Sequence, residues 1–553
     1  RLRGRHRRGL RALNPGERYD VVVIGAGFAG LYALHRLREM SYRTLVLEAA
    51  GDVGGVWYWN RYPGARCDVE SLQYSYSFDA ALEQEWEWTE RYAGQPEILR
   101  YIQHVAERFE LRRHIRFNTR VRAARFDDVR SVWRIETAAG EPIEAQHCVM
   151  ATGALSVPKP PEIPGLSDFR GPVYHTGRWP HRSPDFSGQR VGVIGTGSSG
   201  IQAIPRLAEQ AAHLVVFQRT ANFSIPAWNR ALSPTEQSAF KASYAEHRAR
   251  AREVGTLYEF SEHGALEVSP EARVQEYQRR WNKGGVNFVH AFNDLLINEG
   301  SNETIANFVR EQIRNTVRDP AVAESLCPAD HPLGTKRICV DTGYYETFNR
   351  PNVTLIDLKK TPIERFEATG ARVGSGMIAL DALVCATGYD ALSGALMAID
   401  ITGRNGMRLQ DKWSAGPRTL LGIMTAGFPN LFIITGPGSP SVLVNMIVGI
   451  EHHVQWITDC IAHLRVQQAD TIEATPQAED RWVDHVNQAA SRTLLPRANS
   501  WFLGANVPGK PRVFMPYAVR IGVYRRECQA VVDKGYEGFV ISGEKRRASP
   551  TVH

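Results

Sequence analysis

The chain has 553 residues, of which 43% are hydrophobic and 23% are charged. This length is too great for one hydrophobic core, so we expect two or three domains of a soluble globular protein. The formal charge of +7 lies at the two ends, because residues 1–18 hold seven Arg and one Glu and residues 541–553 hold three Lys or Arg and one Glu. The remaining body carries −1, which argues against a nucleic-acid-binding face.

Both ends are predicted to be basic tails, the first (1–18) disordered. The apolar run at 21–24 enters a glycine motif instead of a cleavage site, so it is not a secretory signal, and no apolar run is long enough to span a membrane. The seven cysteines include no Cys-x-x-Cys pair. This pattern fits a reducing cytoplasm and excludes a disulfide reductase and a zinc ribbon. We therefore expect a cytoplasmic protein with no metal, membrane or nucleic-acid site.

A first dinucleotide-binding motif begins near the N-terminus. The β-branched run 19–24 predicts a strand, which leads into Gly25-x-Gly27-x-x-Gly30 and then into helical apolar spacing at 31–37. These glycines allow backbone N–H groups to approach a pyrophosphate. A second strand at 44–47 ends in Glu48, 18 residues after Gly30. A carboxylate there accepts hydrogen bonds from a ribose diol and repels a 2′-phosphate, so this site favours FAD or NAD.

The next stretch, 54–68, is too rich in aromatic residues and glycine for an idle loop. The alternative is an aromatic core loop in which Asp68 caps the following turn. An amphipathic helix is then predicted over 92–109, and a small sheet over 121–135 and 143–150. This sheet ends in Ala-Thr-Gly at 151–153, a tripeptide that recurs at 386–388.

A linker at 169–180 joins this region to a second glycine motif. It supplies Phe169 and Trp179 for packing, Gly171 for tight backbone and one imidazole, His175, at its centre. Taken alone, His175 is interpreted as a buried, hydrogen-bonded structural histidine.

The second motif repeats the first with a different charge at its end. A strand at 190–194 leads into the glycine-rich turn and a helix that opens at 201, and a further strand at 214–217 precedes Arg219. Arg219 lies 19 residues after the last glycine, where the first motif has Glu48. A guanidinium binds a 2′-phosphate bidentately, so this site favours NADPH. The alternative for Arg219 is a surface salt bridge. The turn consists of Gly195, Thr196, Gly197, Ser198, Ser199 and Gly200.

Residues 230–330 are predicted to be a helical insertion. Ser233-Pro234-Thr235-Glu236 is a capped helix start, and helical spacing over 305–317 stops before Asp319-Pro320. The insertion either shapes a substrate entrance or fills a core.

Two later segments complete the pattern. Lys336-Arg337 alone is interpreted as a solvated pair. A Gly-Pro-rich turn at 436–441 precedes a long apolar helix over 444–464. The positive N-terminus of that helix suits a negatively charged group, or the segment is only a buried helix.

The pattern Phe-x-Gly-x-x-x-His-x-x-x-Trp-Pro at 169–180, between two glycine motifs, resembles the fingerprint of type I Baeyer-Villiger monooxygenases. The resemblance extends over about 19–540. It implies an α/β fold with two Rossmann-like dinucleotide-binding domains, for FAD and NADP, and a helical insertion. The implied boundaries are 19–150 with 386–540 for FAD, 151–229 with 331–385 for NADP, and 230–330 for the insertion.

The resemblance also implies roles for particular residues. Arg337 would be the catalytic cation and Asp68 its partner beside the flavin ring, while His175 would couple the two nucleotide domains. Lys336, Arg219 and Thr220 would hold the NADP phosphate, and Trp501, on a mobile loop, would cover the nicotinamide cofactor. Further cofactor contacts are expected from Phe28, Ala29, Gly55, Val56, Trp57, Tyr62, Tyr74 and Met446, and a substrate pocket from Ser441, Val442 and Leu443.

The implied activity consumes NADPH and O2 and converts ketones to esters or lactones through a C4a-peroxyflavin. The runs at 61–68, 334–337, 436–441 and 500–510 look most like the phenylacetone and steroid monooxygenases, which implies bulky aromatic, cyclic or steroid ketones. We expect a monomer or a weak homo-oligomer.

Two alternatives remain open. An N- or S-oxygenating flavin monooxygenase uses a protonated hydroperoxide and does not call for Asp68 and Arg337. A flavoprotein that only oxidises NADPH could lose Arg337.

Overall fold

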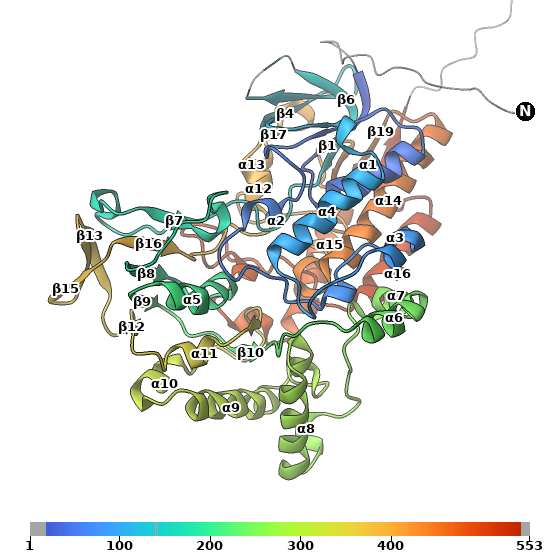
Figure 1. Ribbon diagram of the computed structural model, residues 1–553. Helices are drawn as coiled ribbons and strands as arrows, with labels where there is room; N and C mark the ends of the chain where they lie inside the picture. The colour runs from blue at the N-terminus through green and yellow to red at the C-terminus, as the bar shows by residue number, and fades with distance from the viewer. Residues whose placement is uncertain (1–17, 139, 141, 544–553) are drawn as a thin grey trace, which may run out of the picture.

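Two mainly parallel sheets organise the chain in the computed structural model, which describes residues 18–138, 140 and 142–543 (Figure 1). The fold is therefore α/β with two Rossmann-like units, as predicted. The predicted tails fall mostly outside the described residues. Arg18, which was assigned to the first tail, instead begins β1 (Arg18–Ile24), and β20 (Phe539–Ser542) extends into the second.

The first sheet has eight strands and combines both predicted parts of the FAD-binding domain. Its order is β17-β4-β5-β6-β1-β2-β3, and β18 pairs with β6. The strands other than β1 are β2 (Thr44–Leu47), β3 (Ile115–Arg116), β4 (Val121–Asp127), β5 (Val132–Thr137), β6 (Ile143–Met150), β17 (Asp400–Thr402) and β18 (Leu431–Ile433).

The strands predicted over 121–135 and 143–150 are present, but they do not form a small sheet of their own. Strand β6 is long enough to pair in parallel with β1 from Glu144 to Met150 and also in antiparallel fashion with β5. The β4–β5–β6 strands therefore extend the main sheet.

Strand β1 is buried on both faces, which explains its continuous run of β-branched residues. Val21 and Val23 pack in one core and Val22 and Ile24 in another. The first core is formed with α1 (Phe28–Glu39) and α14 (Met446–Gln467), which pack against each other (Figure 1). The long apolar segment predicted at 444–464 is thus confirmed as a helix.

The second sheet is parallel throughout. Its order is β12-β9-β8-β16-β7, and helix α5 (Ser198–Gln210) packs in its core. Its strands are β7 (Val173–His175), β8 (Arg190–Ile194), β9 (His213–Gln218), β12 (Val353–Asp357) and β16 (Ala382–Cys385).

The insertion between the two halves of the second sheet is helical, as predicted. It contains α6 (Pro234–Ala242), α7 (Tyr244–Val254), α8 (Pro270–Lys283), α9 (Glu299–Thr316) and α10 (Pro320–Leu326). Ser233 and Glu236 form the predicted capping box. Asp319 also caps the start of α10, so Asp319-Pro320 both follows one helix and begins the next. The exact domain boundaries stay a prediction.

The remaining α-helices and β-strands of the described residues complete the fold. They are α2 (Val56–Trp59), α3 (Ala80–Glu85), α4 (Gln95–Arg108), β10 (Ser224–Pro226), β11 (Cys339–Asp341), α11 (Tyr344–Thr347), β13 (Ile363–Glu367), β14 (Gly370–Val373), β15 (Gly376–Ala379), α12 (Gly394–Met397), α13 (Leu409–Lys412), β19 (Thr471–Ala474), α15 (Pro476–Ser491) and α16 (Ile521–Asp533).

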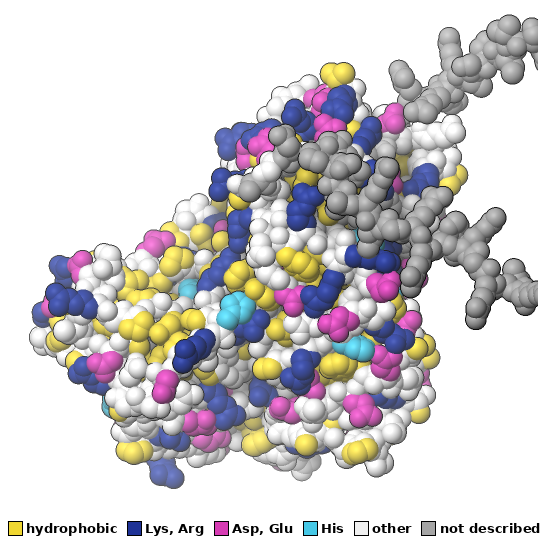
Figure 2. All heavy atoms as spheres, turned by 45° about the horizontal axis from the view of Figure 1, so that its top comes forward, with side chains coloured by type: hydrophobic (Ala, Val, Ile, Leu, Met, Phe, Trp, Pro, Cys, Tyr) yellow, Lys and Arg dark blue, Asp and Glu magenta, His cyan; other side chains and the backbone are white. Residues whose placement is uncertain are grey.

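On the face shown in Figure 2, Lys and Arg side chains alternate with Asp and Glu side chains. This mixture agrees with the near-neutral body of the sequence. Among the helices of the described residues, none has both the length and the apolarity that crossing a membrane requires.

The buried His453 on α14 predicts acid sensitivity of the fold. Its Nδ1 accepts a hydrogen bond from the Thr435 N–H at 3.0 Å, and its Nε2 lies 2.7 Å from the hydroxyl of Tyr524. Burial lowers the pKa of His453 to about 4. The unfolded chain therefore binds more protons between pH 6.5 and 4, and stability falls as the pH drops through this window.

We expect the pKa difference of His453 between the folded and unfolded chain to lower the free energy of unfolding by about 2 kcal/mol at pH 5 relative to pH 8. Thermal unfolding of wild type and His453→Asn at both pH values tests this, with the exposed His263→Asn as control. The fall in Tm on acidification should be smaller in His453→Asn only. Equal falls in all three proteins would contradict the expectation.

Candidate active site

A cavity of about 1260 Å³ lies between the two parallel sheets and is lined by both glycine motifs. It is larger than the roughly 300–1,000 Å³ of a typical small-ligand pocket. It lies beyond the carboxyl ends of β1 and β8, the location at which open parallel sheets bind ligands. Both predicted catalytic residues, Asp68 and Arg337, also line it.

The two glycine turns are built alike, and each packs on one of the Ala-Thr-Gly segments. Gly25 and Gly195 both have φ of +106°. A Cβ on Gly25 would lie 2.5 Å from the carbonyl oxygen of Ala151, and one on Gly195 would lie 2.4 Å from that of Ala386. The recurring tripeptide therefore supplies the backbone that makes glycine necessary at the start of each motif.

The third glycine of each motif does not line the cavity. A Cβ on Gly30 would lie 1.8 Å from the oxygen of Gly25, and one on Gly200 would lie 2.1 Å from that of Gly195. Their role is to bring α1 and α5 close to the preceding strands, so that the N-terminus of each helix faces the cavity.

Glu48 lies at the first half of the cavity with its carboxylate partly engaged. Its two oxygens accept hydrogen bonds from the backbone N–H groups of Ala26, at 2.6 Å, and Ala50, at 2.7 Å. Burial raises its pKa, and these hydrogen bonds oppose that shift. A carboxylate offers about four acceptor positions, so Glu48 can still accept hydrogen bonds from a ribose.

Aromatic side chains form a wall of the same half. The indole of Trp57 donates to the hydroxyl of Tyr74 at 3.2 Å, and Phe28 meets Tyr74 edge to face at 5.4 Å. Tyr62 donates to Gln202 of α5 at 2.7 Å, and burial raises the pKa of Tyr62 to about 12. The other cofactor residues predicted for this half also line the cavity, namely Gly27, Ala29, Gly55, Val56 and Met446.

The second half of the cavity is positively charged. Arg219 and Lys336 both line it, and neither side chain forms a hydrogen bond or ion pair with another described residue. Burial lowers the pKa of Lys336, and the nearby charge of Arg219 lowers it further, while Asp330 opposes the shift. The surface-salt-bridge alternative for Arg219 is therefore wrong. Two cations without a partner fit a phosphate group.

The remaining predicted residues of this half are Gly197, Thr196, Ser198, Ser199 and Thr220, all of which line the cavity. The hydroxyl of Thr196 donates to the carbonyl of Thr220 at 2.9 Å. This bond joins the glycine turn to the segment that carries Arg219.

Asp68 and Arg337 form a side-on ion pair where the two halves meet. Nε of Arg337 lies 2.7 Å from one carboxylate oxygen of Asp68, and Nη2 lies 2.8 Å from the other. Nη1 donates to the carbonyl of Val442 at 2.5 Å. Burial disfavours the charged guanidinium of Arg337, but the attraction of the Asp68 carboxylate outweighs the effect of burial and raises the pKa of Arg337. The guanidinium is therefore permanently charged and fixed in orientation, and it is not a solvated side chain.

His175 ends β7 and binds both segments that run between the sheets. Its Nδ1 accepts from the Gly177 N–H at 3.0 Å, and its Nε2 lies 3.1 Å from the carbonyl of Lys159 and 3.2 Å from the hydroxyl of Thr387. Burial lowers its pKa, so the ring is neutral with its proton on Nε2. His175 does not line the cavity, and its coupling role stays a prediction.

Phe169, Gly171 and Trp179 of the fingerprint also lie outside the cavity. Phe169 packs edge to face on Phe366, and Trp179 is buried in the core of the second sheet. A Cβ on Gly171 would lie 2.4 Å from the carbonyl of Asp381. The fingerprint is thus largely a packed edge of the second sheet.

The predicted substrate residues separate. Val442 lines the cavity, but Ser441 and Leu443 do not. The loop residue Trp501, which was predicted to cover the nicotinamide cofactor, also lines the cavity. The hydroxyl of Ser441 donates to the carbonyl of Thr435 at 3.2 Å.

Among the cavity residues that sequence reasoning missed are Arg178 and Lys159. Arg178, inside the fingerprint, stacks its guanidinium on Trp59 at 4.5 Å. Lys159 donates to the carbonyl of Asn506 at 2.7 Å and so ties the 500–506 loop to the segment beside His175. The position of Arg178 between His175 and Trp179 was the available signal for Arg178, and no motif pointed to Lys159.

Comparisons with known proteins show which proteins this chain is similar to. Residues 22–280 match the family described as pyridine nucleotide-disulphide oxidoreductase. A Baeyer-Villiger monooxygenase of Pseudooceanicola batsensis is 40% identical over 95% of this chain and 96% of its own. A phenazine N-monooxygenase of Lysobacter antibioticus is 38% identical over 96% and 98%. A solved structure, an oxidized steroid monooxygenase bound to NADP, is 52% identical with a TM-score of 0.91, over 95% of this chain and 100% of that one.

Removing the guanidinium of Arg219 is expected to weaken binding of NADPH but not of NADH, because only the former carries a 2′-phosphate. We expect Arg219→Ala to raise the KM for NADPH on the order of tenfold or more, through loss of a charge-assisted contact. Steady-state kinetics with both nucleotides measures this. The control is Arg190→Ala, which breaks an exposed ion pair with Asp381 in the same sheet. An equal loss for NADPH and NADH would argue against a phosphate contact.

Proposed function

This chain belongs to the type I Baeyer-Villiger monooxygenase family, and we propose from that membership and from the Asp68–Arg337 pair that it oxygenates ketones to esters or lactones. It is an NADPH-dependent flavin monooxygenase whose cofactors are FAD and NADP. The proposed reaction converts a ketone, O2, NADPH and a proton into an ester, water and NADP+.

The cavity fits both cofactors by the chemistry of its two halves. The first half, with Glu48 and the aromatic wall, suits the FAD ribose and ring, and the second half, with Arg219 and Lys336, suits the 2′-phosphate of NADP. The chemistry that bound FAD supplies is the transfer of two electrons from NADPH to O2.

Arg337 is proposed to stabilise the negative charge that develops on oxygen when an oxygen nucleophile adds to the ketone carbonyl. A guanidinium suits this task because it stays cationic at working pH and cannot protonate the nucleophile. The side chain of Arg337 is 30% exposed and lines the cavity. Its guanidinium can therefore reach a bound ligand.

Asp68 is proposed to orient Arg337 and to balance part of its charge. Two parallel hydrogen bonds to the carboxylate and a third to the Val442 carbonyl hold the guanidinium plane before substrate binds. Such preorganisation removes the reorganisation that would otherwise oppose charge stabilisation.

The substrates are proposed to be bulky aromatic, cyclic or steroid ketones. The 52% identity to a steroid monooxygenase supports this class, as does the large cavity. The relative named as a phenazine N-monooxygenase keeps oxygenation of nitrogen as the second candidate.

The direct test is product analysis with NADPH, O2 and a panel of phenylacetone, a steroid ketone, cyclohexanone and phenazine. We expect esters or lactones from the bulky ketones, measured by gas chromatography against NADPH consumed. Formation of a phenazine N-oxide without any ester would favour the second candidate.

Arg337→Ala is expected to lower ester formation on the order of a hundredfold or more, because one stabilising charge at the reacting oxygen is lost. The variant should still oxidise NADPH and release hydrogen peroxide, since its cofactor contacts remain. The matched control is Arg314→Gln, which removes an exposed pair with Glu324. Unchanged ester formation in Arg337→Ala would contradict the assigned role.

A further inference from the structure

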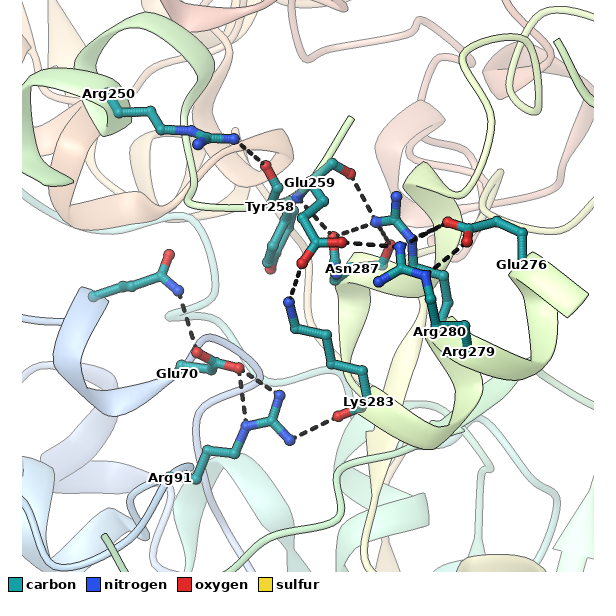
Figure 3. A network of polar contacts seen from close by, with 11 residues as sticks. Glu70, Arg91, Arg250, Tyr258, Glu259, Glu276, Arg279, Arg280, Lys283 and Asn287 are labelled. Atoms are coloured by element: carbon teal, nitrogen blue, oxygen red, sulfur yellow. Dashed lines mark hydrogen bonds and ion pairs between the residues drawn. The ribbon is translucent and has the colours of Figure 1, made fainter. Parts of the chain in front are cut away.

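A network of polar contacts connects the loop that carries Asp68 to the helical insertion (Figure 3). Glu70 lies two residues after Asp68 and forms one end of the network. Helix α8 and the segment around Tyr258 form the other end. Arg91 lies between them.

The guanidinium of Arg91 holds Glu70 with two nitrogens. Nε and Nη2 donate to the same carboxylate oxygen, at 2.9 and 2.6 Å. The backbone of Arg91 is also fixed, because its N–H donates to the carbonyl of Arg230 and its carbonyl accepts from the Ser71 N–H. With only 14% of its side chain exposed, Arg91 fixes the segment that directly follows Asp68.

The third nitrogen of Arg91 reaches two segments of the opposite unit. Nη1 lies 2.8 Å from the carbonyl of Lys283 and 3.3 Å from that of Ala227. Lys283 is the last residue of α8. A cation there satisfies a free carbonyl and interacts favourably with the negative end of the helix dipole.

Helix α8 in turn holds the segment of the insertion that contains Tyr258 and Glu259. Lys283 and Arg279 both pair with the carboxylate of Glu259, at 2.5 and 2.9 Å, and Arg280 donates to the Glu259 carbonyl at 2.7 Å. The neighbouring Tyr258 is held by Arg250, which donates to its carbonyl at 2.9 Å.

The charges of the catalytic pair act on the hydroxyl of Tyr258. Burial raises the pKa of Tyr258, and Tyr92, Asp68 and Glu70 add to this shift while Arg337 opposes it. One chain of contacts therefore runs from Glu70, two residues after Asp68, through Arg91 to the end of α8 and on to Glu259, the neighbour of Tyr258.

We propose that Arg91 is a positioning residue that sets the Asp68 loop and the α8 end of the insertion in one fixed arrangement around the catalytic pair. This inference rests on the proposed function for its effect on turnover, but its structural part stands on contacts alone. Arg91 touches neither substrate nor cofactor in this assignment, because it does not line the cavity.

The effect on turnover follows from geometry. A displacement of about 1 Å at a reacting group can lower a rate on the order of a hundredfold. Asp68 lies two residues before Glu70, whose carboxylate Arg91 holds. Loss of the Arg91 side chain therefore shifts or loosens Asp68, while both cofactor-binding halves of the cavity stay intact.

The experiment compares the FAD-loaded wild type with Arg91→Gln, Arg91→Lys and the control Arg314→Gln. Hydrogen–deuterium exchange by mass spectrometry follows peptides covering 66–74 and 256–290. Kinetics with phenylacetone give the ester formed per NADPH oxidised and the KM for NADPH.

We expect Arg91→Gln to increase exchange in both peptides and to lower ester per NADPH by about tenfold, with the KM for NADPH changed less than twofold. Arg91→Lys should restore part of the yield, since an ammonium keeps the charge but lacks the fork that reaches Glu70 and Lys283 together. The control should match wild type in every measurement.

The inference is overturned if Arg91→Gln keeps the wild-type yield, or if exchange rises only in 256–290, since Arg91 would then only close the end of α8. Wild type that forms no ester from any ketone would overturn the proposed function instead. In that case exchange in the two peptides still decides whether Arg91 links them.

Discussion

The ion pair between Arg337 and Asp68 is the interaction on which the site depends. The two residues are 269 positions apart and come from opposite predicted domains. A guanidinium left without its carboxylate in this part-buried cavity would carry an uncompensated charge, which is strongly unfavourable. The two sheets must therefore be arranged so that the side chains of Asp68 and Arg337 meet. The cavity between the sheets follows from that arrangement.

The two halves of the cavity share one backbone design and differ in charge. Each half begins with a glycine turn packed against an Ala-Thr-Gly carbonyl. In each half a charged residue follows the last glycine of the motif by 18 or 19 positions. Glu48 makes one half suitable for a ribose diol, and Arg219 with Lys336 makes the other suitable for a phosphate. Cofactor preference is thus set by side chains at matched positions of a repeated fold.

Contacts outside the cavity hold these parts together. His175 binds the carbonyl of Lys159 and the hydroxyl of Thr387, one from each crossing between the sheets. Arg91 joins the Asp68 loop to α8. Each of these two side chains has several hydrogen-bonding atoms and so connects segments that are distant in sequence. Hydrogen bonds in several directions fix the relative orientation of these segments, which a single apolar contact cannot do.

The sequence by itself determined the local elements and the chemistry at their ends. Strand β2 and the glycine turns, and within a few residues α1, α4, α9 and α14, were predictable, because hydrophobic period and glycine placement are local properties. Glu48 and Arg219 followed from fixed spacing. Only the tertiary structure decided that β4, β5 and β6 extend the main sheet, that Ser441 does not line the cavity, and that Arg91 pairs with Glu70 two residues after Asp68. Those outcomes depend on pairing between segments far apart in the chain, and no local pattern specifies which distant backbone a strand or guanidinium will meet.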